Sequence, residues 1–346
     1  MYKTIIRPLL FALSMNDAEE AHLLAVRAIK TMQKVPAVIH FIAAWYGANH
    51  NPRPATVCGI PFPNRVGLEA GFDKQAEMLP FLQALGFGFV EEGTVLPLPQ
   101  SGQGRPRLFR LPEQNALINR FGFNSDGARM VRRRLSAVRQ QIRIPIGISL
   151  GKMKDTPLEE AAEDSIKVLQ LLRNYGEYHV VNISSPNTPG LRELQGKRYL
   201  ERLVEEIVGA EQAEASANGE NPKPVFVKFA PDLTLPEIDE SLEAGIGGGA
   251  SGFIIGNTTL TRPLWDKDSA FAKQAGGLSG EPLYPLTLKK FRYARKKTTL
   301  PLMFAGGLMS ADRVKEARDS GADLVQLMTG FIYEGPNLVS AARGVV

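Results

Sequence analysis

The stretch Tyr178-His179-Val180-Val181-Asn182-Ile183-Ser184-Ser185-Pro186-Asn187-Thr188-Pro189-Gly190 joins a short apolar run to a loop of amides, hydroxyls and prolines. Its first part, Tyr178 to Val181, has the length and content of a buried strand. The polar loop is poor packing material, but it suits a rigid turn that presents polar groups to a ligand. Ser185 has no histidine beside it, so it is a candidate for proton transfer rather than acyl chemistry. A polar turn without function is the alternative.

The same pattern of a short apolar run followed by an amphipathic segment recurs along the chain. Helical patterns cover Pro157 to Leu172, Tyr199 to Gln212, Leu286 to Lys296 and Ala311 to Ser320. Eight parallel strands with crossover helices predict an α/β fold, the (β/α)8 TIM barrel. An open doubly wound sheet would need a glycine-rich turn after its first strand, and that turn is missing. The eight predicted strands are Val66 to Ala70, Phe89 to Thr94, Ile146 to Leu150, Tyr178 to Ile183, Val225 to Phe229, Gly252 to Gly256, Leu302 to Gly306 and Leu324 to Met328.

Residues 1–50 differ in composition from the rest of the chain. Apolar residues recur there at helical spacing, and the segment from Val38 to Tyr46 is apolar over most of its circumference. Asn51 to Pro54 interrupts this pattern as a linker. We therefore expect an N-terminal helical extension over residues 1–50 and a barrel over residues 51–346.

Bulk composition narrows the class of protein. A hydrophobic content of 44% with 22% charged residues, over 346 residues, is ordinary for a globular protein with a large core. The single cysteine, Cys58, excludes an internal disulfide, and the four histidines show no metal-site spacing, so we expect no metal. The net charge of +5 is carried by helical clusters without interleaved aromatic residues, so we expect no nucleic-acid partner. No run of about 18 apolar residues predicts a membrane span.

Polar residues or glycines follow every predicted strand. Because the C-terminal strand ends of such barrels meet at one mouth, these groups are expected to share a ligand. They include Gly71 to Lys74, Gly93-Thr94, Gly151-Lys152, the loop after Val181, Ala230 to Asp232, Asn257 to Thr259, Gly306-Gly307 and Thr329-Gly330.

Gly306-Gly307 after the seventh strand and Thr329-Gly330 after the eighth favour a phosphate held on backbone N–H groups. Tight turns without a ligand would explain them as well. Between the sixth and seventh strands, Gly276 to Gly280 is expected to be an extra flexible segment over a flat cofactor.

Lys228 lies inside an apolar strand. It could form a Schiff base, as in an aldolase, act as a fixed cation beside an electron-rich ring, or make a structural ion pair. The many amides favour a planar heterocycle stacked on a flat cofactor, and Lys74 supplies a cation for a carboxylate. These amides are Asn119, Asn182, Asn187 and Asn257.

Several segments together closely resemble the dihydroorotate dehydrogenase family, in order and over essentially the whole chain. The resemblance implies oxidation of (S)-dihydroorotate to orotate in pyrimidine synthesis, with one FMN per chain. Ser185 occupies the place of the base, which points to the quinone-linked class, because the soluble classes have a cysteine there. The segments are Ala70 to Lys74, Arg105 to Arg110, Asn119 to Asn124, Asn182 to Gly190, Lys228 to Asp232, Asn257 to Leu260 and Gly276 to Gly280.

The resemblance also implies roles for individual residues. Ser185 would take a proton from C5 of dihydroorotate while C6 delivers hydride to flavin N5, and Lys228 would sit near flavin N1. The implied substrate-binding residues are Lys74, Asn119, Arg120, Phe121, Gly122, Phe123, Asn182, Asn187, Asn257 and Thr258. The implied cofactor-binding residues are Ala70, Gly71, Phe72, Asp73, Lys74, Thr94, Ser149, Asn182, Lys228, Gly256, Gly280, Gly307, Met328 and Thr329.

In the quinone-linked class the N-terminal helices rest on the membrane and form a tunnel to the flavin. The resemblance thus implies a peripheral protein on the cytoplasmic face of a bacterial membrane, a membrane quinone as acceptor, and a monomer. The apolar excess and nearby basic residues of residues 1–50 suit an interfacial helix pair. A helical cap that merely closes the barrel is the alternative.

Some positions depart from the family pattern. Ser149 and Gly256 remove side-chain contacts to FMN, each hydrogen bond being worth on the order of 1 kcal/mol. Glu69 and Glu92 stand where small or apolar residues are usual, and an interior carboxylate is costly unless it is paired. The remaining departures are Met153 and Met328. They leave two other hypotheses: a barrel that binds flavin weakly or serves as a non-catalytic binding protein, and an aldolase that forms a Schiff base on Lys228.

Overall fold

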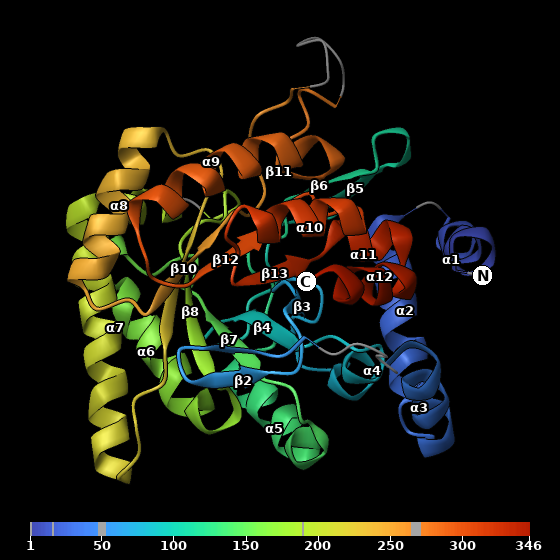
Figure 1. The fold of residues 1–346 in the computed structure, drawn as a ribbon, viewed down its shortest axis with the longest axis horizontal. Coiled ribbons are helices and arrows are strands. Elements are labelled where there is room, and N and C mark those ends of the chain that lie inside the picture. The colour runs from blue at the N-terminus through green and yellow to red at the C-terminus, as the bar shows by residue number, and fades with distance from the viewer. Residues whose placement is uncertain (1, 16, 48–52, 189, 264–270) are drawn as a thin grey trace.

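The computed structural model describes residues 2–15, 17–47, 53–188, 190–263 and 271–346. Its centre is a closed barrel of eight parallel strands, paired in chain order (Figure 1). Each strand predicted from the sequence is present, so the predicted (β/α)8 barrel is confirmed. The strands are β3 (Val66–Leu68), β4 (Phe89–Val95), β7 (Ile146–Leu150), β8 (Tyr178–Asn182), β9 (Val225–Phe229), β10 (Gly252–Ile255), β12 (Leu302–Ala305) and β13 (Leu324–Leu327).

Helices surround the barrel and cover its outer face (Figure 1). In α6 the buried residues Ala161, Ser165, Val168 and Leu172 recur at helical spacing, which gives the helix one apolar side. The predicted helical patterns correspond to α6, α7, α9 and α10. The surrounding helices are α4 (Leu79–Ala84), α5 (Ala128–Val138), α6 (Ala161–Leu172), α7 (Lys197–Asn218), α8 (Leu235–Gly247), α9 (Tyr284–Lys297), α10 (Ala311–Asp319), α11 (Thr329–Glu334) and α12 (Pro336–Val345).

The barrel interior has an apolar layer beneath a polar one. Phe89, Tyr178 and Phe226 belong to one buried cluster inside the barrel. Gly147 makes room for it, because a Cβ there would lie 2.3 Å from Cζ of Tyr178. Since side chains alternate along a strand, the residue two positions beyond Phe226, which is Lys228, points to the same interior. The polar residues of the strand ends therefore rest on a packed apolar base.

Two small antiparallel sheets were not foreseen from the sequence. The hairpin β1 (Ala55–Val57) and β2 (Ile60–Phe62) precedes the first barrel strand. A three-stranded sheet is formed by β5 (Leu108–Leu111), β6 (Ala116–Asn119) and β11 (Gly277–Gly280). The expectation of a flexible segment at Gly276 to Gly280 is therefore wrong, because Gly277 to Gly280 pair with β6 along their whole length. Long-range pairing has overridden the low strand propensity of glycine.

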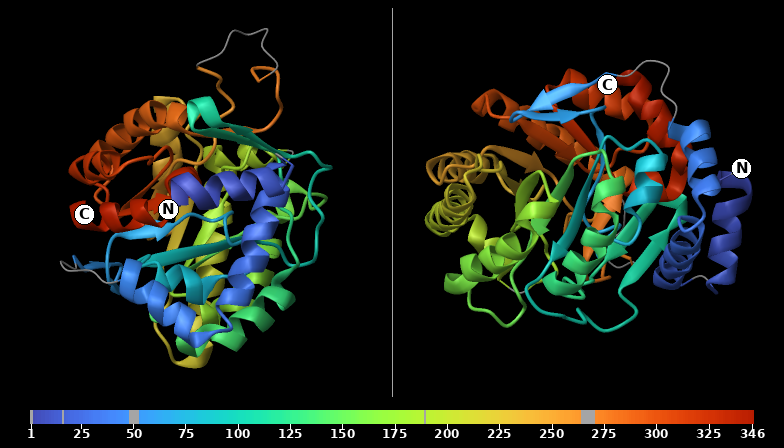
Figure 2. Two further views of the ribbon diagram at one scale, coloured as in Figure 1. Left: turned by 90° about the vertical axis from the view of Figure 1, so that its right-hand side faces the viewer. Right: turned by 90° about the horizontal axis from the view of Figure 1, so that it is seen from below.

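The N-terminal residues form a helical layer on one side of the barrel (Figure 2). Hydrogen bonds join it to the chain's other end: Tyr2 Oη donates to Ile332 O (2.6 Å) and Arg7 Nη1 to Tyr333 O (2.8 Å). Helices are thus present over the described part of the predicted extension. Met1, Asn16 and residues 48–50 of the extension, Asn51 and Pro52 of the predicted linker, and Pro189 of the loop lie outside the described residues. The layer comprises η1 (Tyr2–Ile6), α1 (Arg7–Leu13), α2 (Ala18–Met32), α3 (Pro36–Ile42) and η2 (Ala43–Gly47).

Within the described ranges, no helix combines the length and the apolar character needed to cross a bilayer.

Candidate functional site

A single cavity of about 430 Å³ connects the mouth of the barrel to the N-terminal helices. This volume lies within the range of ordinary small-molecule sites. Residues from the C-terminal ends of the strands line one part of the cavity, which we call the barrel end. Side chains of α1 and α2, among them Leu10, Phe11, His22 and Val26, line another part, which we call the helical end.

Most residues that the sequence singled out line this cavity. Most come from barrel strand ends spread along the chain, which the closed barrel brings together, whereas Asn119 and Phe121 to Phe123 come from β6 and the segment after it. The residues that line it are Ala70, Gly71, Phe72, Asp73, Lys74, Thr94, Asn119, Phe121, Gly122, Phe123, Asn182, Ser185, Asn187, Lys228, Asn257, Thr258, Gly307, Met328 and Thr329.

Four of the residues to which the resemblance gives a role lie outside the lining. So do several strand-end residues that were expected at the shared mouth: Gly93, Gly151, Lys152, Ala230 to Asp232 and Thr259. Arg120 donates to the Pro106 carbonyl, with Nη2 at 2.8 Å, and Ser149 lies behind Thr94, whose hydroxyl is 3.0 Å away. At Gly256 φ is +117° and a Cβ would lie 1.7 Å from Ala305 O, so this backbone accepts only glycine there. Gly280 is similar, with φ at +97° and a Cβ position 2.3 Å from Asn115 O.

Ser185 is presented to the cavity by the loop after β8, and only 8% of its surface is exposed. The backbone N–H of Asn187 donates to its Oγ at 3.3 Å, which fixes the hydroxyl from one side. The side-chain amide of Asn187 donates to both oxygens of Asn119, at 3.1 Å to the carbonyl and 3.2 Å to Oδ1. The loop is therefore tied to the β6 strand across the cavity mouth.

A chain of hydrogen bonds links the amides beneath the loop. Asn257 Nδ2 donates to Ser184 Oγ (2.8 Å), and Ser184 Oγ donates to Asn182 Oδ1 (2.9 Å). Asn182 Nδ2 then donates to Thr94 Oγ1 at 2.7 Å. Each amide orientation is set by its neighbour, so this wall of the cavity is preorganised for a polar ligand edge.

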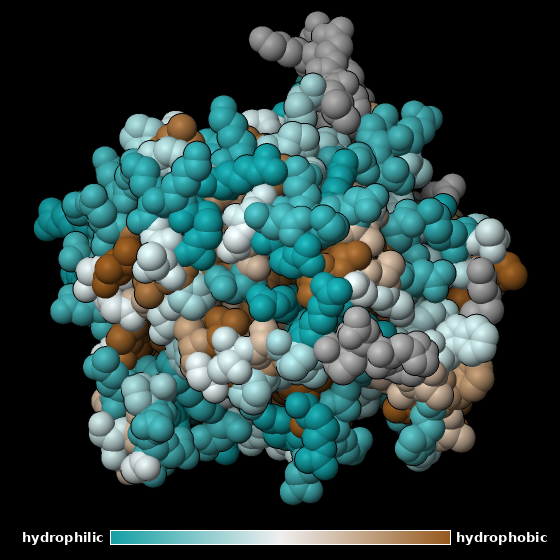
Figure 3. Space-filling view, in the orientation of Figure 1, coloured by the Kyte–Doolittle hydropathy of each residue, from teal (hydrophilic) through white to brown (hydrophobic). Residues whose placement is uncertain are grey.

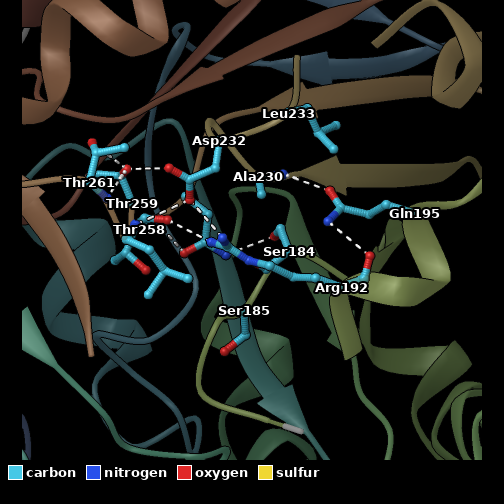
Figure 4. Close-up of polar contacts among 12 residues, drawn as sticks. Ser184, Ser185, Arg192, Gln195, Ala230, Asp232, Leu233, Thr258, Thr259 and Thr261 are labelled. Atoms are coloured by element: carbon cyan, nitrogen blue, oxygen red, sulfur yellow. Dashed lines mark hydrogen bonds and ion pairs between the residues drawn. The ribbon is translucent and has the colours of Figure 1, made fainter. Parts of the chain in front are cut away.

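Arg192 ties three strand-end loops together, and sequence reasoning missed it. Its Nε donates to Ser184 O (2.9 Å), its Nη2 to Thr258 O (2.9 Å), and its Nη1 pairs with Asp232 Oδ2 (2.6 Å). Figure 4 shows this guanidinium between the loops, with the Ser185 side chain pointing away from it. Nothing local distinguishes Arg192 in the sequence, because its partners lie in distant segments. We call this arrangement the Arg192 clamp.

Lys74 is partly buried in the cavity wall. Its Nζ donates to Asn124 Oδ1 at 2.6 Å and lies 3.5 Å from the ring centroid of Phe121. Burial, reinforced by the positive charge of Arg107, lowers the pKa of Lys74 to about 7. A carboxylate ligand beside Nζ would therefore favour the protonated amine.

The neighbouring Asp73 organises its own loop. It accepts hydrogen bonds from the N–H groups of Glu77 (2.8 Å) and Met78 (2.7 Å), and burial raises its pKa to about 6.

Lys228 is fully buried and makes an ion pair inside the barrel. Its Nζ lies 3.0 Å from Glu69 Oε1 and 3.8 Å from Glu91 Oε1. Burial alone would lower the pKa of Lys228, but the two carboxylates outweigh it and the net pKa lies above its ordinary value. The carboxylate expected to be costly at Glu69 is thus paired with a cation.

Glu92 is buried, and no cation pairs with it among the described residues. Its Oε2 accepts the N–H of Ala76 at 3.1 Å, and burial with the nearby Asp73 charge raises its pKa well above the ordinary value. Burial therefore favours the uncharged form of this carboxyl group.

The rim near β12 and β13 is lined by bare backbone. Gly306, Gly307 and Gly330 line the cavity, and a Cβ at Gly330 would lie 2.0 Å from Leu308 O. Thr329 Oγ1 donates to Ser279 Oγ (2.8 Å), which places a second hydroxyl at the same rim. Such a glycine-lined rim suits an anion bound by main-chain N–H groups.

At the helical end the lining is mainly apolar, with two basic side chains, His22 and Arg110, to which the sequence analysis gave no individual role. Burial, together with the Lys74 charge, lowers the pKa of His22 to about 4, so this ring is neutral at pH 7. Arg110 stacks on Phe11 at 3.8 Å, and its Nη1 is buried without a hydrogen-bond partner among the described residues. The contact of Arg110 with Phe11 and the influence of Lys74 on His22 both join segments that are far apart in the sequence.

The fold and the cavity define an α/β-barrel enzyme with a polar site at its strand ends and an apolar extension beneath N-terminal helices. The chain matches the family model for dihydroorotate dehydrogenase over residues 54–343. A dihydroorotate dehydrogenase (quinone) of Salinispora arenicola is 46% identical over 99% of this chain and 98% of its own length. The corresponding protein of Chloroflexus aurantiacus is 43% identical, over 97% of this chain and 93% of its own.

A solved structure of a dihydroorotate dehydrogenase is also similar to this chain. The crystal structure of dihydroorotate dehydrogenase from Eimeria tenella in complex with ferulenol is 30% identical and has a TM-score of 0.83, over 98% of this chain and 93% of that one. The chain belongs to the dihydroorotate dehydrogenase family, in its quinone-linked branch, and is an oxidoreductase.

Proposed function

We propose that this protein oxidises (S)-dihydroorotate to orotate in pyrimidine synthesis, with FMN as cofactor and a membrane quinone as electron acceptor. The observation that carries the proposal is the composition of one cavity. It holds Ser185, the amides Asn119, Asn187 and Asn257, and two lysines at the barrel end, and it continues into an apolar end under α1 and α2.

The lining fits FMN. The glycine rim at Gly306-Gly307 and Gly330 offers backbone to a phosphate, and Lys228 is a buried cation in the same cavity. Thr94 and Asn182 present polar groups on a wall fixed by their mutual hydrogen bond. When bound, FMN supplies the acceptor, at N5, for a hydride from C6 of the substrate.

The chain's own residues handle the proton and the substrate. Ser185 Oγ takes the proton from C5 of dihydroorotate, and Lys74 binds the substrate carboxylate. Asn119, Asn187 and Asn257 hydrogen-bond the edge of the pyrimidine. A serine must pass its proton on, and Thr188 has a buried hydroxyl without a hydrogen-bond partner among the described residues.

The same geometry disfavours the aldolase hypothesis. A Schiff-base lysine must be an unprotonated amine when it attacks a carbonyl. The ion pair with Glu69 at 3.0 Å instead keeps Lys228 protonated. We therefore expect no trapping of a carbonyl substrate on Lys228 by borohydride.

The N-terminal layer is proposed to rest on the membrane as a peripheral element. Its exposed apolar side chains include Leu9 (54%), Leu13 (64%), Phe41 (66%) and Trp45 (70%). In Figure 3, brown and pale-brown residues gather on the right-hand edge, where Figure 1 places α1 and α3. Such helices would bury this surface at the lipid boundary of the cytoplasmic face and open the cavity toward a quinone. We propose a monomer.

The test is anaerobic mixing of the purified yellow protein with dihydroorotate while the flavin absorbance is followed. We expect the flavin band to bleach, and to return on addition of a quinone faster than with NAD or fumarate. A colourless protein that takes up no FMN would instead support the non-catalytic binding barrel. Bleaching followed by reoxidation with NAD or fumarate alone would contradict the quinone-linked assignment.

A further inference from the structure

Lys228 pairs with two carboxylates inside the barrel, Glu69 and Glu91, and Gln326 contacts Glu91 in turn. Lys228 and Glu91 are 1% and 0% exposed, whereas the Glu69 side chain is 12% exposed. Lys228, Glu69 and Gln326 all line the cavity. A ligand in the barrel end therefore meets an ion pair rather than a lone cation.

The contacts show how the charges are shared. Glu69 Oε1 is 3.0 Å from Lys228 Nζ, which is a direct charge-assisted contact, whereas Glu91 Oε1 is 3.8 Å away. Gln326 Nε2 donates to Glu91 Oε2 at 2.5 Å, and Glu91 Oε1 has no hydrogen-bond partner among the described residues. Burial raises the pKa of Glu91 above its ordinary value, although Lys228 opposes this. Glu69 is consequently the main counter-charge of Lys228.

The position of Glu69 makes this pairing specific. It directly follows β3, while Lys228 lies within β9, and the two strands are not neighbours in the barrel. Their side chains meet across the interior because both point inward above the apolar layer. An attraction between opposite charges in a water-poor interior is much stronger than at the surface. Glu69 therefore reduces the positive potential that Lys228 projects into the cavity.

We propose that Glu69 is a positioning and charge-balancing residue that holds Lys228 and weakens its preference for a reduced, negatively charged flavin over an oxidised one. The inference rests on the proposed function, since it assigns Glu69 a role toward the cofactor of that site. The consequence is a lower reduction potential, which favours passing electrons on to the acceptor.

The test compares the wild type with Glu69→Gln, which keeps the shape and removes the charge. The FMN-loaded proteins are titrated spectroelectrochemically, and FMN affinity is measured by fluorescence. We expect the ratio of affinities for reduced and oxidised flavin to rise at least tenfold in Glu69→Gln, a shift of about 30 mV upward for a two-electron couple. Glu77→Gln is the matched control. Glu77 also lines the cavity, but it pairs with Lys30 and Arg134, and no shift is expected.

A Lys228→Met background separates an effect of Glu69 that runs through Lys228 from a field that Glu69 exerts on the flavin by itself. If Glu69 acts through Lys228, the Glu69→Gln shift disappears when Lys228 is already methionine. An unchanged potential in FMN-loaded Glu69→Gln, or a shift that persists in Lys228→Met, would overturn the inference. Should Glu69→Gln fail to fold, Glu69→Ala gives the same readout and is held to the same outcomes. A wild-type protein that binds no FMN would instead overturn the proposed function.

Discussion

The two ends of the cavity are built in different ways. At the barrel end, Ser185, Asn187 and Asn182 are buried or partly buried and are held by short chains of hydrogen bonds. At the helical end the lining is mainly apolar, and the N-terminal layer to which α1 and α2 belong carries exposed side chains such as Trp45 of η2, at 70%. Fixed polar groups suit proton transfer and substrate alignment, whereas an apolar, partly exposed layer suits a hydrophobic acceptor that enters from a membrane. A substitution at the barrel end should therefore affect flavin reduction by dihydroorotate, and a substitution at the helical end should affect flavin reoxidation by quinone.

The largest effect is expected from Ser185→Ala. Because the variant lacks the hydroxyl that takes the proton, flavin reduction by dihydroorotate should slow by about 100-fold to 10,000-fold. FMN should stay bound, and reoxidation by quinone should keep its rate. Stopped-flow absorbance of the two half-reactions measures both quantities.

Ser185→Cys is the companion variant, since a thiol can also act as the base. It should keep more activity than Ser185→Ala, with a pH profile that follows the thiol. Reduction at the wild-type rate in Ser185→Ala would refute the role of Ser185 and remove the distinction between the two ends.

In the N-terminal helical layer, Phe41→Glu combined with Trp45→Glu should weaken binding to lipid vesicles by tenfold or more. These rings stack on each other with centroids 6.1 Å apart and are 66% and 70% exposed. Full burial of such a side chain is worth about 1.5–3 kcal/mol, so losing both is a large change. Vesicle co-sedimentation measures it, and reduction by dihydroorotate should not change.

Ile246→Glu serves as the control, because Ile246 is 47% exposed on α8, on the opposite side of the molecule from α3 (Figure 1). Equal loss of vesicle binding in this control would show that the apolar surface of the N-terminal helices is not the membrane contact.

The sequence predicts the barrel end better than the helical end, for a physical reason. Each barrel strand is a continuous apolar run, and the closure of the barrel brings the strand ends together, so Lys74, Ser185 and Asn257 can be placed from local patterns alone. Pairings between distant segments leave no local trace. The Arg192 clamp, the Glu69–Lys228 pair and the stacking of Arg110 on Phe11 depend on such pairings. The β11 strand escaped prediction because its glycines pair only through β6.

At the barrel end, a change of pH is expected to have a moderate effect on the affinity for orotate. The pKa of Lys74 is about 7, far below the usual lysine value, so its amine is charged below pH 7 and neutral above it. Orotate binding needs the charged form, so affinity should fall as pH rises from 6 to 8, by up to about tenfold per pH unit above the pKa. Binding above pH 7 should take up a proton, which calorimetry in two buffers detects.

Lys74→Met should bind orotate weakly and show no such dependence between pH 6 and 8. A wild-type affinity that stays constant over this range would mean that Lys74 does not hold the carboxylate, or that it is charged throughout. Quinone-driven reoxidation, which belongs to the helical end, is expected to be independent of Lys74.

The smallest effects come from a matched pair of helix caps. Asp17 Oδ1 accepts the N–H groups of Glu19 (2.8 Å) and Glu20 (3.0 Å) at the start of α2. Thr234 forms a capping box with Glu237 at the start of α8. Replacing either cap by alanine should cost about 1 kcal/mol of stability.

If the helical layer opens independently of the barrel, Asp17→Ala should speed hydrogen exchange within α2 by about fivefold. Thr234→Ala should instead lower the free energy of global unfolding, measured by urea titration. Equal loss of global stability in both variants would show that the two regions unfold as one unit, so that they differ in chemistry but not in cooperativity.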